Sequence, residues 1–295
     1  MYANVNGTKV FYDVDGKQVV YDAARDCMKE KPICFILHGG PGGDHNIYGE
    51  TFHWLSDYMQ LVYIDYRGNG RSERGDKSLY TTKQYVADIE ALRQHLSIEK
   101  VVVMGQSFGG IMSQAYAIQY PEHTAAAVLI ATAPSCETMA NASEQLKKRG
   151  TPEMQAYFNE VMRKGTFQSD EDLYEYLINF APLYTLYGVE AYCKEVGHCV
   201  LSYEASNVGL IDLNTYNFLD DLHKITCPTF VMGGKEDFIA TIDQTHKIAA
   251  RVKDCQVVVI DDSSHEVFLD QPEKAKAALD AFVRERIVPL TKYCG

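Results

Sequence analysis

The sequence predicts an α/β fold with a mostly parallel central sheet, flanking helices and an inserted helical cap. Continuous apolar runs alternate with helical patterns along most of the chain. Glycine-rich turns and reactive side chains directly follow several of the apolar runs. One long stretch, residues 134–222, interrupts the alternation and carries most of the net negative charge of the chain.

Six continuous apolar runs have the composition of strands that are buried on both faces. They are Ile33–Leu37, Leu61–Asp65, Val101–Met104, Ala127–Ala131, Thr229–Met232 and Val257–Ile260. Nearer the N-terminus, Thr8–Tyr12 and Gln18–Tyr21 flank Asp15-Gly16, and this pattern predicts a β-hairpin.

Helical patterns lie between and after these runs. Gln84–Leu96 has its apolar residues on one helix face, and Ile111–Tyr120 ends just before Pro121. Ala275–Val288 has the pattern of a C-terminal helix. Strands and helices that alternate in this way predict a mostly parallel sheet with helices on both faces.

Residues 134–222 contain no clear strand and predict several short helices, such as Glu153–Lys164 and Asp170–Asn179. This segment has six Lys and Arg against 14 Asp and Glu, a net charge of −8. We predict that residues 1–133 and 223–295 form the core and that residues 134–222 form the cap. The acidic residues either solvate exposed helices or favour a cationic ligand, and the eight tyrosines of the cap either line a pocket or pack it onto the core.

The composition narrows the possible partners. The 295 residues are 46% hydrophobic and 23% charged, as in a globular protein with a large core. A net charge of −12 argues against nucleic-acid binding. No apolar run approaches the roughly 20 residues that span a bilayer, and the first residues lack the pattern of an export signal. We therefore expect a cytoplasmic protein without a membrane partner; the sequence leaves the oligomeric state open.

The eight cysteines are scattered, and no two of them form a Cys-x-x-Cys pair. This spacing gives no support to a zinc site or a redox motif. In a reducing compartment we expect free thiols.

The strongest chemical signal is Gly105-Gln106-Ser107-Phe108-Gly109, which follows a predicted strand and precedes a predicted helix. The pattern G-x-S-x-G in this context is typical of a nucleophilic serine on a tight strand-to-helix turn. Glycines are needed there because the turn is strained and closely packed. Ser107 is therefore the candidate nucleophile.

A serine hydroxyl needs a base, and the base needs a carboxylate that orients it. Asp237 follows the predicted strand Thr229–Met232, and His265 follows the next one, Val257–Ile260. The carboxyl ends of parallel strands meet at one edge of the sheet, where ligands bind. Ser107, Asp237 and His265 are thus predicted to form a triad, with Glu236 the nearest alternative to the aspartate.

A glycine-rich loop, His38-Gly39-Gly40-Pro41-Gly42-Gly43, directly follows the predicted strand Ile33–Leu37. An acyl-transfer site needs backbone N–H groups aimed at the developing oxyanion. We expect these from Gly40 and from Phe108, the residue after the candidate nucleophile. The loop matches neither of the common phosphate-binding patterns. His38 is expected to brace the loop rather than act as a base.

These elements, together with Asp65-Tyr66-Arg67-Gly68-Asn69-Gly70-Arg71-Ser72, resemble the α/β-hydrolase superfamily and, within it, the proline iminopeptidase family. The resemblance implies a Ser-His-Asp hydrolase that needs no metal or organic cofactor. It also implies cap glutamates that bind a substrate's free amino group, for which Glu204 is the candidate. The chain departs from the family with Phe108 where the family usually has Trp and with Tyr66 where it usually has Gln.

Three functions remain open at this stage. The first is a proline iminopeptidase-like aminopeptidase that acts on short peptides or amino-acid amides. The second is a hydrolase of a small ester, lactone or amide without a free amine. The third is a non-catalytic receptor for a small molecule, which the complete Ser, Asp and His set disfavours.

Overall fold

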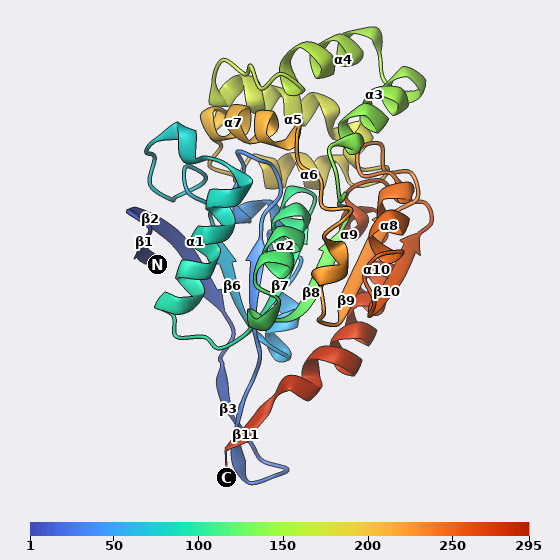
Figure 1. Ribbon diagram of the computed structural model, residues 1–295. Coiled ribbons are helices and arrows are strands. Elements are labelled where there is room, and N and C mark those ends of the chain that lie inside the picture. The colour runs from blue at the N-terminus through green and yellow to red at the C-terminus, as the bar shows by residue number, and fades with distance from the viewer. Residues whose placement is uncertain (295) are drawn as a thin grey trace.

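The computed structural model describes residues 1–294, and over this range eight strands form the central sheet (Figure 1). Their order across the sheet is β1-β2-β6-β5-β7-β8-β9-β10. Their bounds are β1 Tyr2–Val5, β2 Thr8–Asp15, β5 Ile33–Leu37, β6 Gln60–Ile64, β7 Val101–Gln106, β8 Thr124–Ile130, β9 Thr229–Gly234 and β10 Cys255–Ile260. The six apolar runs of the sequence are therefore strands, within a few residues at their ends.

The sheet is parallel from β6 to β10 and antiparallel at the N-terminal edge, where β2 pairs with β1 and β6. Every residue of β5 and β7 is buried, because helices cover both faces of the sheet there. The predicted fold class, a mainly parallel sheet with flanking helices, is confirmed.

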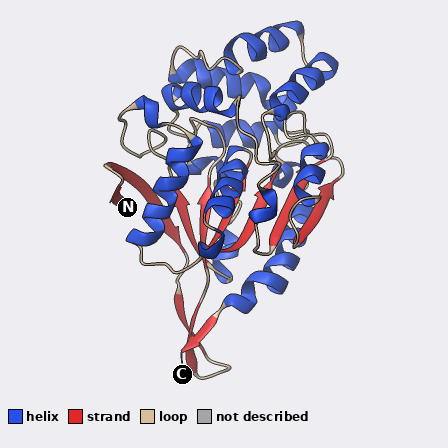
Figure 2. Ribbon diagram, viewed as in Figure 1, coloured by secondary structure: helices blue, strands red, loops and turns tan. Residues whose placement is uncertain are grey.

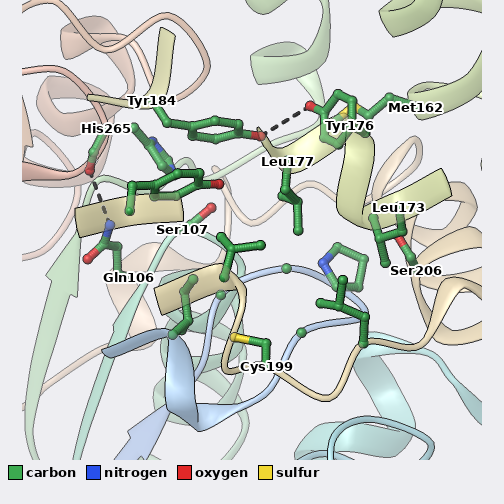
Figure 3. Close-up of a pocket in the computed structure, with 18 of the residues that line it drawn as sticks. Gln106, Ser107, Met162, Leu173, Tyr176, Leu177, Tyr184, Cys199, Ser206 and His265 are labelled. Carbon is green, nitrogen blue, oxygen red and sulfur yellow. Dashed lines mark hydrogen bonds between the residues drawn. The ribbon is translucent and has the colours of Figure 1, made fainter. Parts of the chain in front are cut away.

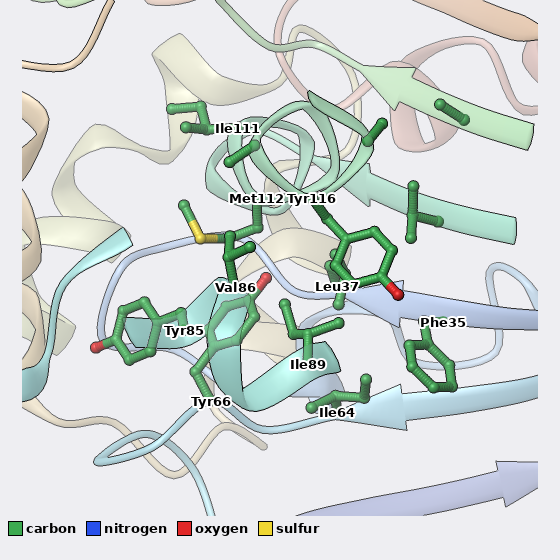
Figure 4. Close-up of a cluster of buried hydrophobic side chains, with 14 of the residues drawn as sticks. Phe35, Leu37, Ile64, Tyr66, Tyr85, Val86, Ile89, Ile111, Met112 and Tyr116 are labelled. Atoms are coloured by element: carbon green, nitrogen blue, oxygen red, sulfur yellow. The ribbon is translucent and has the colours of Figure 1, made fainter. Parts of the chain in front are cut away.

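Two apolar clusters, one on each face, hold the helices against the sheet. On one face α1 (Thr82–His95), α2 (Phe108–Gln119) and α8 (Ile242–Ala249) contribute to the first cluster, part of which is drawn in Figure 4. On the other face lie α9 (Val267–Asp270) and α10 (Pro272–Phe282), which extends into a further helical turn, Val283–Ile287. The predicted C-terminal helix thus begins three residues earlier than expected.

Shorter helical turns connect these elements. They are His45–Tyr48, His53–Asp57, Lys77–Leu79, Pro121–His123, Phe158–Met162, Leu222–Lys224 and Val288–Leu290.

The hairpin predicted at Asp15-Gly16 is wrong. β3 (Val19–Asp22) pairs with β4 (Cys27–Glu30), and β4 also pairs with β11 (Lys292–Cys294), so these strands form a separate small sheet. It projects from the body at the opposite end from the helices above the main sheet (Figure 2). The N-terminal hairpin joins β1 to β2 instead, through Asn6-Gly7, both of which have positive φ. Asn-Gly is the dipeptide that such two-residue turns prefer.

Between β8 and β9 the chain forms five α-helices above the sheet in Figure 1. Their bounds are α3 Glu137–Arg149, α4 Pro152–Tyr157, α5 Asp170–Tyr184, α6 Val189–Val196 and α7 Tyr203–Leu213. Side-chain caps define where α5 and α7 begin: Ser169 accepts from the Asp172 amide, and Ser202 accepts from the Ala205 amide. We call residues 134–222 the cap segment.

The cap segment has an apolar cluster of its own, made mainly of residues between Met139 and Leu210. It leaves and rejoins the core at one place, where Ser135 and Asn217 form an isolated antiparallel bridge. The Cys136 amide donates to the Tyr216 carbonyl at 2.9 Å, and the Phe218 amide donates to the Pro134 carbonyl at 2.8 Å. The ends of the insertion are therefore adjacent.

Candidate active site

Ser107 occupies the turn between β7 and α2 with a backbone φ of 57°, a left-handed conformation that is uncommon for residues other than glycine. The close packing of this turn explains its two glycines. A Cβ on Gly109 would lie 1.8 Å from the Leu37 carbonyl oxygen, and one on Gly105 would lie 2.2 Å from the Gly109 carbonyl carbon. The turn carries the Ser107 side chain into a cavity above the sheet (Figure 3).

His265 and Asp237 lie beyond the ends of the neighbouring strands β10 and β9, and they form a hydrogen bond. The distance from His265 Nδ1 to Asp237 Oδ2 is 2.7 Å, and both residues are buried. The other carboxylate oxygen, Oδ1, accepts from the amides of Ile239 and Ala240 at 2.9 Å each. The carboxylate is thus held by the backbone and presents one oxygen to the imidazole.

The second nitrogen of His265, Nε2, is buried and has no hydrogen-bond partner among the described residues. His265 and Ser107 line the same cavity, but no hydrogen bond joins them. In structures without substrate such contacts are often long, and they tighten when substrate binds.

The environment of His265 changes its pKa in opposing directions. Burial favours the neutral imidazole, but the charge and hydrogen bond of Asp237, and the charge of Glu266, favour the imidazolium. Their combined effect raises the pKa of His265 above its ordinary value. The group is therefore arranged to accept a proton at Nε2.

The glycine-rich loop lies beside Ser107, and Gly40 has a φ of 128°. A Cβ at this position would lie 3.0 Å from the Gly42 amide nitrogen, so the loop conformation requires glycine. No hydrogen bond within residues 1–294 uses the amide of Gly40 or that of Phe108, the first residue of α2. Both residues also line a second, smaller cavity next to Ser107.

His38 braces this loop, as the sequence predicts. Its Nδ1 lies 2.7 Å from the Gly39 carbonyl, and its Nε2 lies 3.4 Å from the Tyr66 amide. His38 is fully buried, and burial lowers its pKa, so the neutral ring donates to Gly39 and accepts from Tyr66.

The larger cavity has a volume of about 100 Å³ and a largely apolar wall. The wall comes from the glycine-rich loop, from Ser107 and from residues of the cap segment, among them Tyr176, Tyr184 and Cys199 (Figure 3). Three of the eight cap tyrosines contribute to it, Tyr176, Tyr184 and Tyr192, and the hydroxyls of Tyr176 and Tyr184 lie 3.1 Å apart. Its other apolar residues include Ile47, Met162, Phe167, Leu173, Leu177, Val196, Leu201 and Leu210.

Glu266 supplies the acidic side chain of this wall, and the sequence did not single it out. Gln106 Nε2 donates to Glu266 Oε2 at 2.6 Å and to the His265 carbonyl at 3.2 Å. Burial, opposed by His265 and Gln106, raises the pKa of Glu266. Burial, followed by the charge of Glu266, also raises the pKa of nearby Glu195 to about 7. This side of the cavity therefore holds two acidic groups that ionise less readily than they would in water.

Glu204, the candidate amine-binding residue, lies outside the cavity wall. It stands in the first turn of α7, and its Oε1 forms an ion pair with Lys77 Nζ at 2.5 Å on the protein surface. The structure thus brings Ser107, Asp237, His265, Gly40 and Phe108 to one place but leaves Glu204 elsewhere.

Among the side chains that the structure describes, no group of three or more from His, Cys, Asp and Glu is arranged to hold a metal ion. Nor does any helix within residues 1–294 combine the length and apolar character needed to span a bilayer.

Comparison with known proteins defines the class. A family model for the alpha/beta hydrolase fold matches residues 32–272. The chain therefore belongs to the α/β-hydrolase family, and the prediction of a hydrolase is confirmed at that level.

Curated relatives narrow the family further. The chain is 30% identical over 270 residues to proline iminopeptidase PfmaB of Pestalotiopsis fici, an alignment covering 88% of this chain and 94% of that relative. The resemblance to proline iminopeptidases is thus confirmed.

Solved structures show the same fold. A proline iminopeptidase of Mycobacterium smegmatis has a TM-score of 0.75 at 19% identity, covering 98% of this chain and 99% of the other. An esterase of Exiguobacterium antarcticum has a TM-score of 0.73 at 19% identity, covering 96% and 98%. At these identities the likeness shows the fold alone.

Proposed function

We propose that the chain is a serine hydrolase that works through an acyl-enzyme on Ser107. Ser107 Oγ attacks the scissile carbonyl carbon while its proton passes to His265 Nε2, and Asp237 stabilises the imidazolium. The amides of Gly40 and Phe108 donate to the oxyanion. The intermediate collapses as His265 returns the proton to the leaving group. Water then attacks the acyl-enzyme through the same base and releases the acid.

The observation that carries this proposal is the buried His265–Asp237 hydrogen bond, which leaves Nε2 available on the cavity that Ser107 lines. The backbone amides of Gly40 and Phe108 also support the proposal, since neither donates a hydrogen bond within residues 1–294. The mechanism needs no metal, because the imidazole and the backbone provide the base and the electrophilic groups.

We further propose that the substrate carries a free amine, as in a proline iminopeptidase acting on short peptides or amino-acid amides. Glu266 supports this assignment, since it is the acidic side chain of a largely apolar wall. Its hydrogen bond from Gln106 still leaves acceptor capacity for an ammonium group. The names of the relatives agree with this assignment.

A small ester or lactone without an amine is the second candidate. The largely apolar wall of the cavity favours it, together with the position of Glu204 outside that wall. An aromatic or aliphatic acyl group would gain from burial there without any charged partner.

Replacing the nucleophile tests the mechanism. Ser107→Ala should lower kcat on prolyl-alaninamide by about 10⁴-fold or more, because the triad acts as a unit. A serine-directed phosphonate should label Ser107 in the unaltered protein, as read by mass spectrometry of the digested chain. Labelling of another residue, or near-normal turnover in the variant, would rule out this nucleophile.

Replacing the carboxylate tests the substrate class. Glu266→Gln should raise KM for prolyl-alaninamide much more than for its N-acetylated analogue. Losing a charged hydrogen bond costs about 1.5–3 kcal/mol, or roughly 10- to 100-fold. Glu204→Gln is the matched control, since it removes a carboxylate at the surface. Equal effects of Glu266→Gln on both substrates would favour the ester or lactone candidate, and a selective effect of Glu204→Gln would restore the assignment made from the sequence.

A further inference from the structure

The two cavities beside Ser107 share part of their walls, and we call them the larger arm and the smaller arm. The larger arm, described above, has a volume of about 100 Å³, and the smaller arm has a volume of about 40 Å³. Both arms are lined by the same five residues at their junction: Gly40, Ser107, Met162, Leu210 and His265. A carbonyl carbon bonded to Ser107 at this junction can therefore extend one substituent into each arm.

The wall of the smaller arm offers no charge to a ligand. It comes from the glycine-rich loop, the start of α2, the residues just after β8, the cap segment and the loop after Asp237. Its threonine hydroxyls are already used, since Thr132 Oγ1 donates to the Ser107 carbonyl at 2.8 Å and Thr138 Oγ1 donates to the Ile239 carbonyl. The remaining residues are apolar or glycine apart from Ser107 and His265: Gly40, Phe108, Ile111, Ala131, Ala133, Met139, Met162, Leu210, Leu213, Ile239 and Ala240.

The two walls differ in charge, and this difference orients the substrate. Glu266 lines the larger arm and not the smaller one. If the α-amine of the acyl residue binds Glu266, that residue occupies the larger arm, and the leaving group must lie in the other. His265 lines both arms, so it can protonate a leaving nitrogen there.

We propose that the smaller arm is the leaving-group subsite, and that it selects a small apolar residue after the scissile bond. This inference rests on the proposed function. A water needs about 10–15 Å³ of such space, so the arm of about 40 Å³ holds about three water-sized groups, enough for the nitrogen, Cα and methyl group of an alanine residue. A charged side chain would lose its hydration there without gaining a partner.

The test keeps the acyl group constant and varies the leaving group. Prolyl-alaninamide, prolyl-leucinamide and prolyl-lysinamide all give the same prolyl-enzyme, so their ratios of kcat/KM report acylation alone. For the unaltered protein we expect the alanine substrate to be preferred over each of the others by about tenfold or more.

Variants then test whether the leaving group occupies the smaller arm. Leu213→Ala, which widens the smaller arm, should raise the ratio for leucine over alanine by about tenfold. Ile239→Ala widens the same arm from a partly exposed position and serves as a second variant if Leu213→Ala folds poorly. Leu177→Ala, in the larger arm only, is the matched control and should change kcat/KM for all three substrates by one common factor.

The outcomes separate the two proposals. Turnover of all three substrates without preference, or ratios that respond to Leu177→Ala and not to Leu213→Ala or Ile239→Ala, would overturn the subsite while leaving the proposed function intact. Failure to cleave any prolyl substrate would overturn both. A preference for alanine that the two widening variants relax supports the subsite.

Discussion

At the residue scale, the charge around His265 determines when it can act as a base. Burial lowers its pKa, and the negative charges of Asp237 and Glu266 more than reverse this, so the pKa is raised. The imidazolium cannot accept the proton of Ser107. In the proposed mechanism, activity should therefore be present above the raised pKa and be lost as the pH falls through it.

This reasoning predicts the acid limb of the pH profile. The limb of kcat/KM for a neutral ester should have its midpoint above about 6.5, the ordinary histidine value. Glu266→Gln removes one of the charges that raise the pKa of His265, so the limb should move to lower pH. Stopped assays from pH 5 to 9 measure both midpoints.

The control for this shift is Glu204→Gln, whose carboxylate pairs with Lys77 at the surface. It should leave the limb in place. A midpoint at or below the ordinary histidine value, or an identical midpoint in Glu266→Gln, would contradict the electrostatic account.

Glu204 and Glu266 also show which features of the site could not be predicted from the sequence. Glu204 and Ser206 are two positions apart on α7, about 200° around the helix. Ser206 lines the cavity, and Glu204 therefore points away from it toward Lys77. The sequence around α7 does not show which face of this helix is turned toward Ser107. The residue next to the predicted histidine, Glu266, offered the better signal because its position in the chain already fixes it near the site.

At the element scale, the buried parallel strands could be predicted because both of their faces are apolar. β5 matches its predicted bounds of Ile33–Leu37 in full. The turn after each strand then placed the candidate triad, since parallel strands end at one edge. The positions of Ser107, Asp237 and His265 along the chain thus carried most of the information about the site.

The short strands at the N-terminus could not be predicted in the same way. The run at Gln18–Tyr21 was assigned to a hairpin with Thr8–Tyr12, but β3 pairs with β4 and not with β2. The pairing of β4 with β11 joins residues more than 260 positions apart, so no local pattern records it. The Asn6-Gly7 turn was the stronger hairpin signal.

At the scale of the whole molecule, the cap segment sits directly on the glycine-rich loop. The Ser202 amide donates to the Gly42 carbonyl at 2.8 Å. A Cβ on Gly42 would lie 2.6 Å from the Ser206 Cβ, and one on Gly209 would lie 2.6 Å from the Pro41 Cβ. The cap therefore closes the site while its own apolar cluster, apart from Phe238, lies within the segment.

This arrangement predicts that deleting the cap segment separates the reactivity of Ser107 from the selection of the substrate. Replacing residues 136–216 by an Asn-Gly turn would join Ser135 to Asn217, which already pair as an antiparallel bridge. The sheet and its flanking clusters remain, so the shortened chain should still unfold cooperatively in urea. Its free energy of unfolding should be lower, because the first cluster loses Ala205, Leu213 and Tyr216.

The shortened chain should keep the reactivity proposed for Ser107 and lose its substrate selectivity. A small phosphonate should still label Ser107, because the turn between β7 and α2 belongs to the core. The ratio of kcat/KM for prolyl-alaninamide over p-nitrophenyl acetate should fall by at least about tenfold, since the apolar wall of α5 to α7 is gone. The same deletion carrying Ser107→Ala controls for non-specific esterase activity. An unchanged ratio would show that the core alone selects the substrate, and the absence of both cooperative unfolding and labelling would show that residues 134–222 are part of a single folding unit.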